Sequence, residues 1–216
     1  MIGDKVHGKL IANRLLTDVE EIMLEAYGLP DGYVDIGLFE TEFEGIGYVA
    51  ADYATKNANV EVVSINSTYG GSAAGKSNDG HVFGIISGPM VSDVQRGLRY
   101  VRNYIENEAG VYSMAEDDGC VFYAEFISRI GKHFAKAYDL KEGSSIAYLV
   151  APSMYGVIGV DEALTLANVE VVKYWAVPTA SNLTGAIVTG SQAQCKMAVE
   201  GFKNAIFDCA EDPIEY

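Results

Sequence analysis

Apolar positions along this chain follow two spacings that alternate from one end to the other. Short apolar or alternating runs predict strands, and stretches with apolar residues three and four positions apart predict helices. The first half predicts strands at 9–16, 34–42, 60–65 and 82–86, and helices at 17–27, 48–58 and 92–105. The second half predicts strands at 120–127, 146–151, 169–175 and 185–189, and helices after 128, at 160–167 and at 193–209.

Several helix ends carry residues that favour caps. Thr17 and Glu20 have the spacing of a capping box, and Gly28 is expected to end the helix that they open. Ser92 is expected to cap the long helix of the first half. Ser128 takes the place of Thr17 in the second half.

One hexapeptide occurs twice. Ala-Asn-Val-Glu-Val-Val stands at 58–63 and again at 167–172, an offset of 109 residues in a chain of 216. Other matches at similar offsets pair Ala26-Tyr27 with Ala137-Tyr138 and Ser87-Gly88 with Thr189-Gly190. Similarity at one period over the whole length indicates two diverged copies of one unit.

The order of elements is the same in both copies and predicts an α/β fold of the α+β sandwich type. Each copy has a strand hairpin and helices, so we expect a mostly antiparallel sheet flanked by helices. The repeat divides the chain into two domains, 1–112 and 113–216.

The copies differ most in one loop. Asn59 to Gly88 spans 29 positions and Asn168 to Gly190 spans 22, so the first copy carries seven more residues. The added residues fall in 66–80 (NSTYGGSAAGKSNDG), which is rich in glycine and serine. Function concentrates in loops that a scaffold presents, so this insertion is where the copies are expected to diverge in function.

Composition narrows the class of protein. With 49% hydrophobic residues the chain can bury a core, and a formal charge of −15 argues against nucleic acid or an anionic membrane as partner. The three cysteines lack CxxC spacing, the start lacks a signal peptide, and no apolar run is long enough to span a membrane. A soluble intracellular protein with reduced thiols is expected.

Residues 70–77 (GGSAAGKS) satisfy the P-loop pattern GxxxxGKS. A P-loop needs a helix that starts at its Lys-Ser, whereas a strand is predicted directly after this loop. Nucleotide binding therefore stands as an alternative to a flexible Gly/Ser loop.

Few of the remaining polar residues are candidates for a catalytic or metal-binding site. His7, His81 and His133 are scattered, so we predict no metal site within one chain and no catalytic residues, that is, no enzyme. The alternating acidic residues Glu40, Glu42 and Glu44 are either a solvated strand edge or a carboxylate cluster for a small cation.

Three consecutive motifs resemble a known family. Gly37 to Thr41 (GLFET), Tyr48 to Asp52 (YVAAD) and Ala58 to Val62 (ANVEV) are similar to the strand, helix and strand of the bacterial microcompartment (BMC) shell domain. Two copies, each preceded by a strand and a helix, resemble its circularly permuted tandem form from ethanolamine-utilisation compartments. The resemblance covers essentially the whole chain.

This resemblance implies a homotrimer, in which six similar domains form a pseudo-hexagonal tile that packs with other microcompartment shell proteins. It also implies a gated pore on the three-fold axis. The glycine-rich insertion is the expected gate, because glycine permits large backbone changes. Its gating residues are Tyr69, Gly70, Gly71, Ser72, Gly75 and Lys76.

Smaller pores that bind ethanolamine are implied as well, at Glu44, Gly45, His81, Val111, Ser181, Asn182 and Leu183. Glu44 would supply the charge for an ammonium group, and Asn182 would bond the hydroxyl. Gly45 and His81 replace acidic residues of relatives, so we expect weaker ethanolamine binding. Cobalamin is a possible cargo of the wide pore, with no cofactor expected. A trimeric small-molecule sensor is a further alternative.

Overall fold

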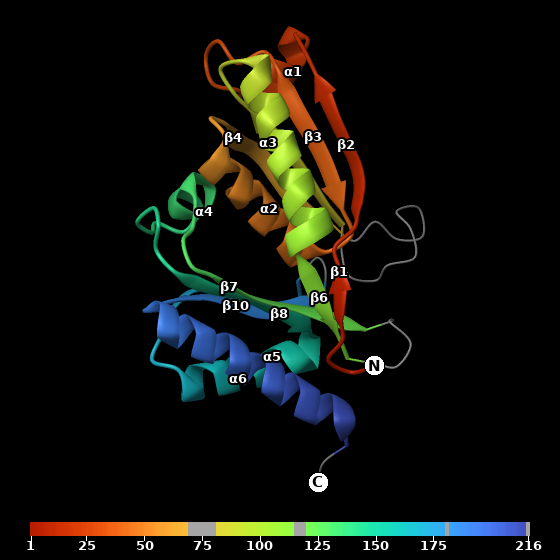
Figure 1. Cartoon of the computed structure of the whole chain (residues 1–216), viewed down its shortest axis with the longest axis vertical. Coiled ribbons are helices and arrows are strands. Elements are labelled where there is room, and N and C mark those ends of the chain that lie inside the picture. The colour runs from red at the N-terminus through yellow and green to blue at the C-terminus, as the bar shows by residue number, and fades with distance from the viewer. Residues whose placement is uncertain (69–80, 115–119, 180–181, 215–216) are drawn as a thin grey trace. The chain divides into compact units, whose positions relative to one another are not determined.

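The described part of the chain comprises residues 1–68, 81–114, 120–179 and 182–214 of a computed structural model (Figure 1). It divides into two compact units. The N unit consists of His7–Ala109 and Gly131–Asp139, and the C unit consists of Met1–Val6, Gly110–Ile130 and Leu140–Tyr216. The units therefore differ from the contiguous halves 1–112 and 113–216, because a segment of the second copy packs within the N unit.

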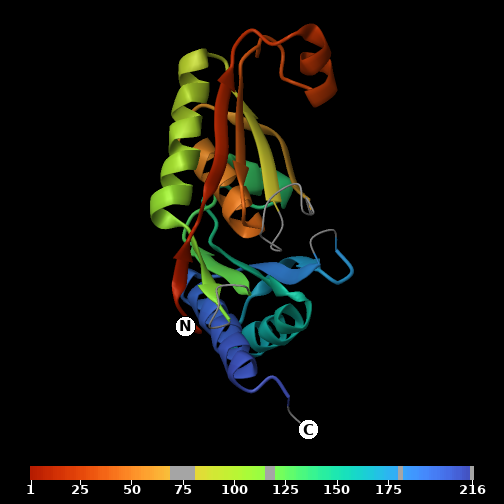
Figure 2. The same cartoon turned by 90° about the vertical axis from the view of Figure 1, so that its right-hand side faces the viewer.

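The N unit is built on a four-stranded antiparallel sheet in the order β2-β3-β5-β4. Helices α2 and α3 pack against each other and on this sheet, and α4 packs on α2 (Figures 1 and 2). Its elements are β2 (Leu10–Leu16), α1 (Glu21–Tyr27), β3 (Ile36–Thr41), α2 (Glu44–Asn57), β4 (Glu61–Thr68), β5 (His81–Ser87), α3 (Val91–Asn103) with a π-helical turn (Tyr104–Glu108), and α4 (Lys132–Ala137).

The C unit carries a six-stranded sheet in the order β1-β6-β7-β8-β10-β9. Helices α5 and α6 pack against each other and cover one face of it (Figure 1). Its elements are β1 (Lys5–His7), β6 (Gly110–Ser113), β7 (Val121–Ile127), β8 (Ile146–Pro152), α5 (Ser153–Leu166), β9 (Glu170–Trp175), β10 (Leu183–Thr189) and α6 (Gln192–Glu211).

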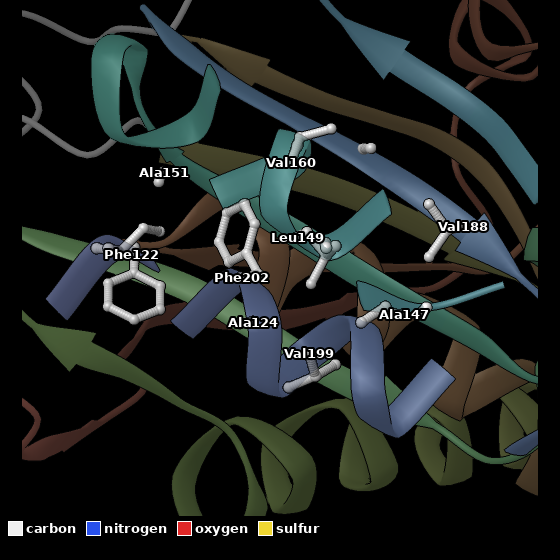
Figure 3. Close-up of a cluster of buried hydrophobic side chains, with 14 of the residues drawn as sticks. Phe122, Ala124, Ala147, Leu149, Ala151, Val160, Val188, Val199 and Phe202 are labelled. Atoms are coloured by element: carbon white, nitrogen blue, oxygen red, sulfur yellow. The ribbon is translucent and has the colours of Figure 1, made fainter. Parts of the chain in front are cut away.

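Between this sheet and its helices lies a continuous apolar core (Figure 3). Phe122 and Leu149 from the strands meet Val160 of α5 and Phe202 of α6, and all four are less than 5% exposed. Close packing at one point needs a glycine, because a Cβ on Gly156 of α5 would collide with the backbone of Thr184. Burial of such side chains is the main stabilising term of the unit.

The internal repeat is visible in the backbone. β2-β3-β5-β4 of the N unit corresponds to β7-β8-β10-β9 of the C unit, with the same neighbour order. Left-handed backbone angles recur at an offset of 111 residues, at Gly28 (φ 60°) and Asp139 (φ 52°), and at Gly32 (φ 82°) and Gly143 (φ 84°). The predicted α+β fold and duplication are confirmed, and β1 and β6 are additions that the periodicity did not predict.

Three predicted helix caps are wrong. The first residue before each helix is Glu20 for α1, Met90 for α3 and Gly131 for α4, and none has a capping side-chain bond. Thr17, Ser92 and Ser128 therefore do not act as N-caps. For α4 the reason is tertiary, because another helix supplies the acceptor. Gly28 does end α1 in the left-handed conformation, as predicted.

Candidate functional site

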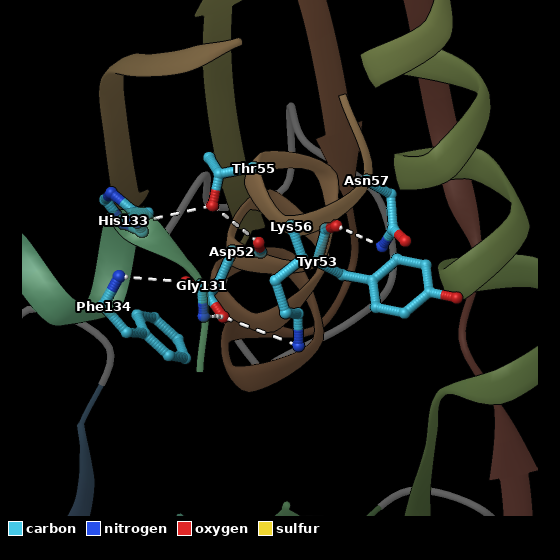
Figure 4. Close-up of polar contacts among 8 residues, drawn as sticks. All are labelled: Asp52, Tyr53, Thr55, Lys56, Asn57, Gly131, His133 and Phe134. Carbon is cyan, nitrogen blue, oxygen red and sulfur yellow. Dashed lines mark hydrogen bonds and ion pairs between the residues drawn. The ribbon is translucent and has the colours of Figure 1, made fainter. Parts of the chain in front are cut away.

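A buried carboxylate on α2 organises the polar centre of the N unit (Figure 4). Asp52 is fully buried and accepts hydrogen bonds from the backbone N–H groups of Gly131 (2.7 Å) and Phe134 (3.0 Å) at the start of α4. The Lys56 Nζ lies 3.7 Å from the same carboxylate. The Asp52 side chain thus caps α4, whose N-cap residue Gly131 lies 79 residues downstream.

Thr55 adds a second link between the two helices. Its hydroxyl donates to the Asp52 carbonyl at 2.8 Å and accepts from the His133 backbone N–H at 3.4 Å. Gly131 has no room for a side chain, because a Cβ there would lie 2.7 Å from the Asp52 carbonyl oxygen. The position of α4 on α2 is therefore closely fixed.

This docking brings Tyr138, just after α4, to the start of α2. Burial raises the pKa of Tyr138 well above its usual range, and the charges of Tyr48, Glu44 and Asp52 raise it further. Burial also raises the pKa of Tyr48, with Glu44 the next cause. The phenols of Tyr48 and Tyr138 therefore stay neutral near pH 7. Both lie near the half-buried carboxylate of Glu44.

Glu44 is the first residue of α2, where the helix dipole favours a negative charge. Its carboxylate accepts a hydrogen bond from the Ser67 hydroxyl of β4 at 2.9 Å. Gly45 beside it is buried. A carboxylate held at a helix start among neutral hydroxyls can bind a small organic cation. Sequence reasoning found Glu44 but missed Ser67, Tyr48 and Tyr138, although the Ala-Tyr repeat pair contains Tyr138.

His81 begins β5 and is buried. Its Nδ1 lies 3.3 Å from a Glu40 carboxylate oxygen. β4 places Ser67 next to Thr68, the strand partner of His81. Two adjacent residues of β4 therefore connect these side chains, because Ser67 donates to Glu44 and Thr68 pairs with His81.

The acidic residues Glu40, Glu42 and Glu44 each contact a different partner. Glu40 faces His81, Glu42 pairs with Lys9 at 2.9 Å, and Glu44 accepts from Ser67. Across the described residues, no three His, Cys, Asp or Glu side chains lie close enough together to hold a metal ion. Of the two alternatives for this trio, a solvated strand edge or a joint carboxylate cluster, the cluster is not formed.

The other predicted ligand residues belong to the C unit. Val111 is buried in β6. Asn182 adopts a left-handed conformation (φ 57°), and the Ser153 hydroxyl donates to its carbonyl at 2.9 Å and lies 3.3 Å from its Oδ1. Leu183 begins β10, and its carbonyl accepts from the Thr179 hydroxyl at 2.8 Å. Ser181 lies outside the described residues.

The predicted gate and the P-loop pattern also fall outside the described residues, since 69–80 contains Tyr69, Gly70, Gly71, Ser72, Gly75 and Lys76. β4 and β5 are the strands that lead into and out of this segment. None of the helices described here is long and apolar enough to cross a membrane.

A small hollow of about 270 Å³ lies on the N unit, lined by Lys132, His133, Lys136, Thr55, Val60, Glu61 and Val62. His133 is half-buried there, and burial, followed by the charge of Lys136, lowers its pKa to about 4. The imidazole is therefore neutral near pH 7 and contributes packing rather than charge.

Comparisons with known proteins agree on one family. A family model described as the BMC domain matches residues 35–115. The bacterial microcompartment shell protein EutL of Clostridium perfringens is 34% identical over 217 residues, covering 100% of both chains. The crystal structure of the ethanolamine utilization protein EutL from Leptotrichia buccalis matches with a TM-score of 0.93, at 37% identity, over 100% of both chains.

A structure described as a trimeric bacterial microcompartment shell protein PduB shares the fold, with a TM-score of 0.80 at 19% identity, over 94% of this chain and 89% of that one. The full-length match to EutL extends over both copies of the repeat and over the elements that precede each. This chain belongs to the EutL family of bacterial microcompartment shell proteins.

Proposed function

We propose that this protein is a structural tile of an ethanolamine-utilisation microcompartment shell and forms a homotrimer. The observation that carries the proposal is the duplication, because three chains with two like units each supply the six units of a hexagon. The relatives are named as shell proteins rather than enzymes, which supports a role without catalysis.

Electron microscopy of the purified protein tests the tile directly. Hexagonal layers with one trimer per lattice point are the expected result. A trimer that forms no layers, alone or mixed with other shell proteins, would favour the alternative of a small-molecule sensor. Raised melting temperature with ATP would instead favour nucleotide binding by residues 70–77.

Ethanolamine is the proposed ligand of the smaller pores. Glu44 would accept the ammonium group and Asn182 would bond the hydroxyl, with Gly45, His81, Val111, Ser181 and Leu183 as further contacts. The support for Glu44 is its half-buried carboxylate at the start of α2, near the neutral Tyr48 and Tyr138. Because Glu40 lies 3.3 Å from His81, it would offset the charge of a protonated imidazole.

The glycine-rich insertion is the proposed gate of the wider pore, through which bulky cargo such as cobalamin would pass. Proline at Gly70 and Gly71 restricts the backbone and should hold the pore in one state. Crystals of the double variant should then contain a single pore form. An unchanged mixture of open and closed pores in variant and parent would exclude these glycines from gating.

A further inference from the structure

Helix α4 presents two lysines and a histidine to the hollow of about 270 Å³ on the N unit. Lys132 and Lys136 are four residues apart, so their side chains lie on the same face of the helix. His133 lies beside Lys132 and lines the hollow as well. All the lining residues belong to the N unit, so the hollow forms within one compact unit of a single chain.

The lining carries an excess of positive charge. Among the described residues, neither Lys132 nor Lys136 forms an ion pair. Because His133 is neutral near pH 7, the two ammonium groups and the carboxylate of Glu61 leave one excess positive charge at the hollow. Charges farther away than about 8 Å are largely screened at physiological ionic strength. The hollow therefore attracts small anions, although the chain as a whole is acidic.

Part of the lining is apolar. Val60 is 2% exposed and Val62 is half-buried, and both line the hollow. Thr55 offers mainly its methyl group, because its hydroxyl already donates to the Asp52 carbonyl and accepts from the His133 backbone N–H. An anion that covers these groups needs an apolar body as well as a charged end.

The helix equivalent to α4 carries the opposite charge. α1 follows β2 as α4 follows β7, and at the offset of 111 residues Lys132 and Lys136 correspond to Glu21 and Glu25 of α1. Two carboxylates at these positions repel an anion. The duplication alone therefore does not account for the lysines of α4.

The helix on which α4 packs also differs between the copies. α2 corresponds to α5 at the offset of 109 residues, so Asp52 and Thr55 correspond to Asp161 and Leu164. Asp161 is exposed and Leu164 is 38% exposed, whereas Asp52 and Thr55 are buried. The polar link that positions α4 beside the hollow thus has no equivalent at α5 within the described residues.

We propose that the hollow binds a short-chain monocarboxylate. The carboxylate lies between the ammonium groups of Lys132 and Lys136, and the alkyl chain lies against Val60 and Val62. A monoanion matches the single excess charge, and inorganic phosphate would leave the two valines uncovered. The inference goes beyond the proposed shell function and does not depend on it, because one N unit supplies every lining residue.

A nuclear magnetic resonance titration of the full-length protein with butyrate tests the site. With isotope-labelled histidine, the ring signals of His133 should shift and saturate with a dissociation constant on the order of 1 mM. His7 is exposed and does not line the hollow, so its signals should stay in place. Signals of His133 that do not move, or that move no more than those of His7, would overturn the inference.

Lysine variants show whether the charges bind the ligand. Lys132→Ala and Lys136→Ala should each raise the butyrate dissociation constant about fivefold, as expected for an exposed charge pair. The double variant Lys132→Glu/Lys136→Glu has the charges of α1 and should lose binding. Lys141→Ala is the matched control, because Lys141 is exposed and does not line the hollow. Equal affinity in the double variant and the parent would exclude the lysines and overturn the inference.

Matched ligands separate the charge from the alkyl chain. Butylamine has the same chain with a positive charge and should not shift the His133 signals. Acetate should bind more weakly than butyrate, by up to about fourfold for each missing CH₂ group. Tighter binding of inorganic phosphate than of butyrate would show that the valines make no contribution and would overturn the choice of a monocarboxylate.

Discussion

Helices α2 and α5 are equivalent elements of the repeat, yet within the described residues only α2 has a further helix, α4, packed on it besides the long helix of its own unit. α2 has α4 on its outer side, held by Asp52 and Thr55, and buries nine of its 14 residues. α5 has the same length and buries four. The difference shows that a repeated helix can keep its fold while the burial of its outer side differs between the two copies.

The largest expected contrast is between Asp52 and Asp161. Asp52→Ala leaves two backbone N–H groups of α4 without their buried acceptor, which should lower the free energy of unfolding by about 2–4 kcal/mol. Asp161→Ala should change it by less than about 0.5 kcal/mol in the dissociated chain, because Asp161 is exposed. Urea unfolding of the dissociated chains measures both, and equal losses would mean that the two helices are covered alike.

Gly131 and Glu20 give the next contrast. A Cβ on Gly131 would lie 2.7 Å from the Asp52 carbonyl oxygen and from the Thr55 hydroxyl, so Gly131→Ala should cost about 1–3 kcal/mol of stability. Glu20→Ala, at the equivalent exposed position, should cost less than about 0.5 kcal/mol. Thermal unfolding of both variants tests whether the residue before α4 is packed more closely than the equivalent residue before α1. A tolerated Gly131→Ala would show that α4 can shift on α2.

The covered contact should also respond to pH. The pKa of His133 is about 4 in the folded chain against 6.5 when unfolded, so the unfolded state binds the additional proton between these values. Stability contributed by neutral His133 is therefore complete above pH 6.5 and is lost as the pH falls to about 4, by about 2–3 kcal/mol.

Unfolding of the parent and of His133→Phe across this pH range isolates the effect. Burial raises the pKa of Asp52, so that carboxyl gives the opposite slope just above its usual pKa of 3.8, but it is common to both proteins. His133→Phe should reduce the loss of stability at acidic pH. A parent and variant with parallel pH profiles would show that His133 is solvated in the folded chain.

The smallest expected effects concern Glu44. Glu44→Gln removes a negative charge near Tyr48 and Tyr138, so the pKa of both phenols should fall toward the usual value, as ultraviolet titration would detect. If Glu44 binds the ammonium group, ethanolamine affinity measured by calorimetry should fall roughly tenfold. Glu42→Gln, whose carboxylate pairs with exposed Lys9, is the matched control. Affinity equal in both variants would exclude Glu44 from the site.

Much of the fold could be predicted because it depends on local patterns. The strands at 34–42 and 82–86 agree with β3 and β5 because apolar residues recur at strand spacing, and Gly28 ends α1 because glycine tolerates a left-handed backbone. The predicted helices at 48–58 and 160–167 begin too late. α2 and α5 start at Glu44 and Ser153, in stretches without a clear polar face.

The candidate site was less predictable, because its members meet only through tertiary packing. Glu44 is recognisable from its motif, but Ser67 is a strand residue with no distinguishing neighbours in the sequence. Tyr138 reaches Glu44 only because α4 crosses into the N unit.

The duplication, the order of elements and the family follow from residue identity and spacing, which need no contact information. Which helix packs on which other helix depends on contacts between residues far apart in the chain. Ser128 has a better capping side chain than Gly131, yet α4 begins after Gly131, because the buried Asp52 carboxylate outcompetes a local hydroxyl. Its counterpart Asp161 on α5 remains exposed, because no described helix start lies against it.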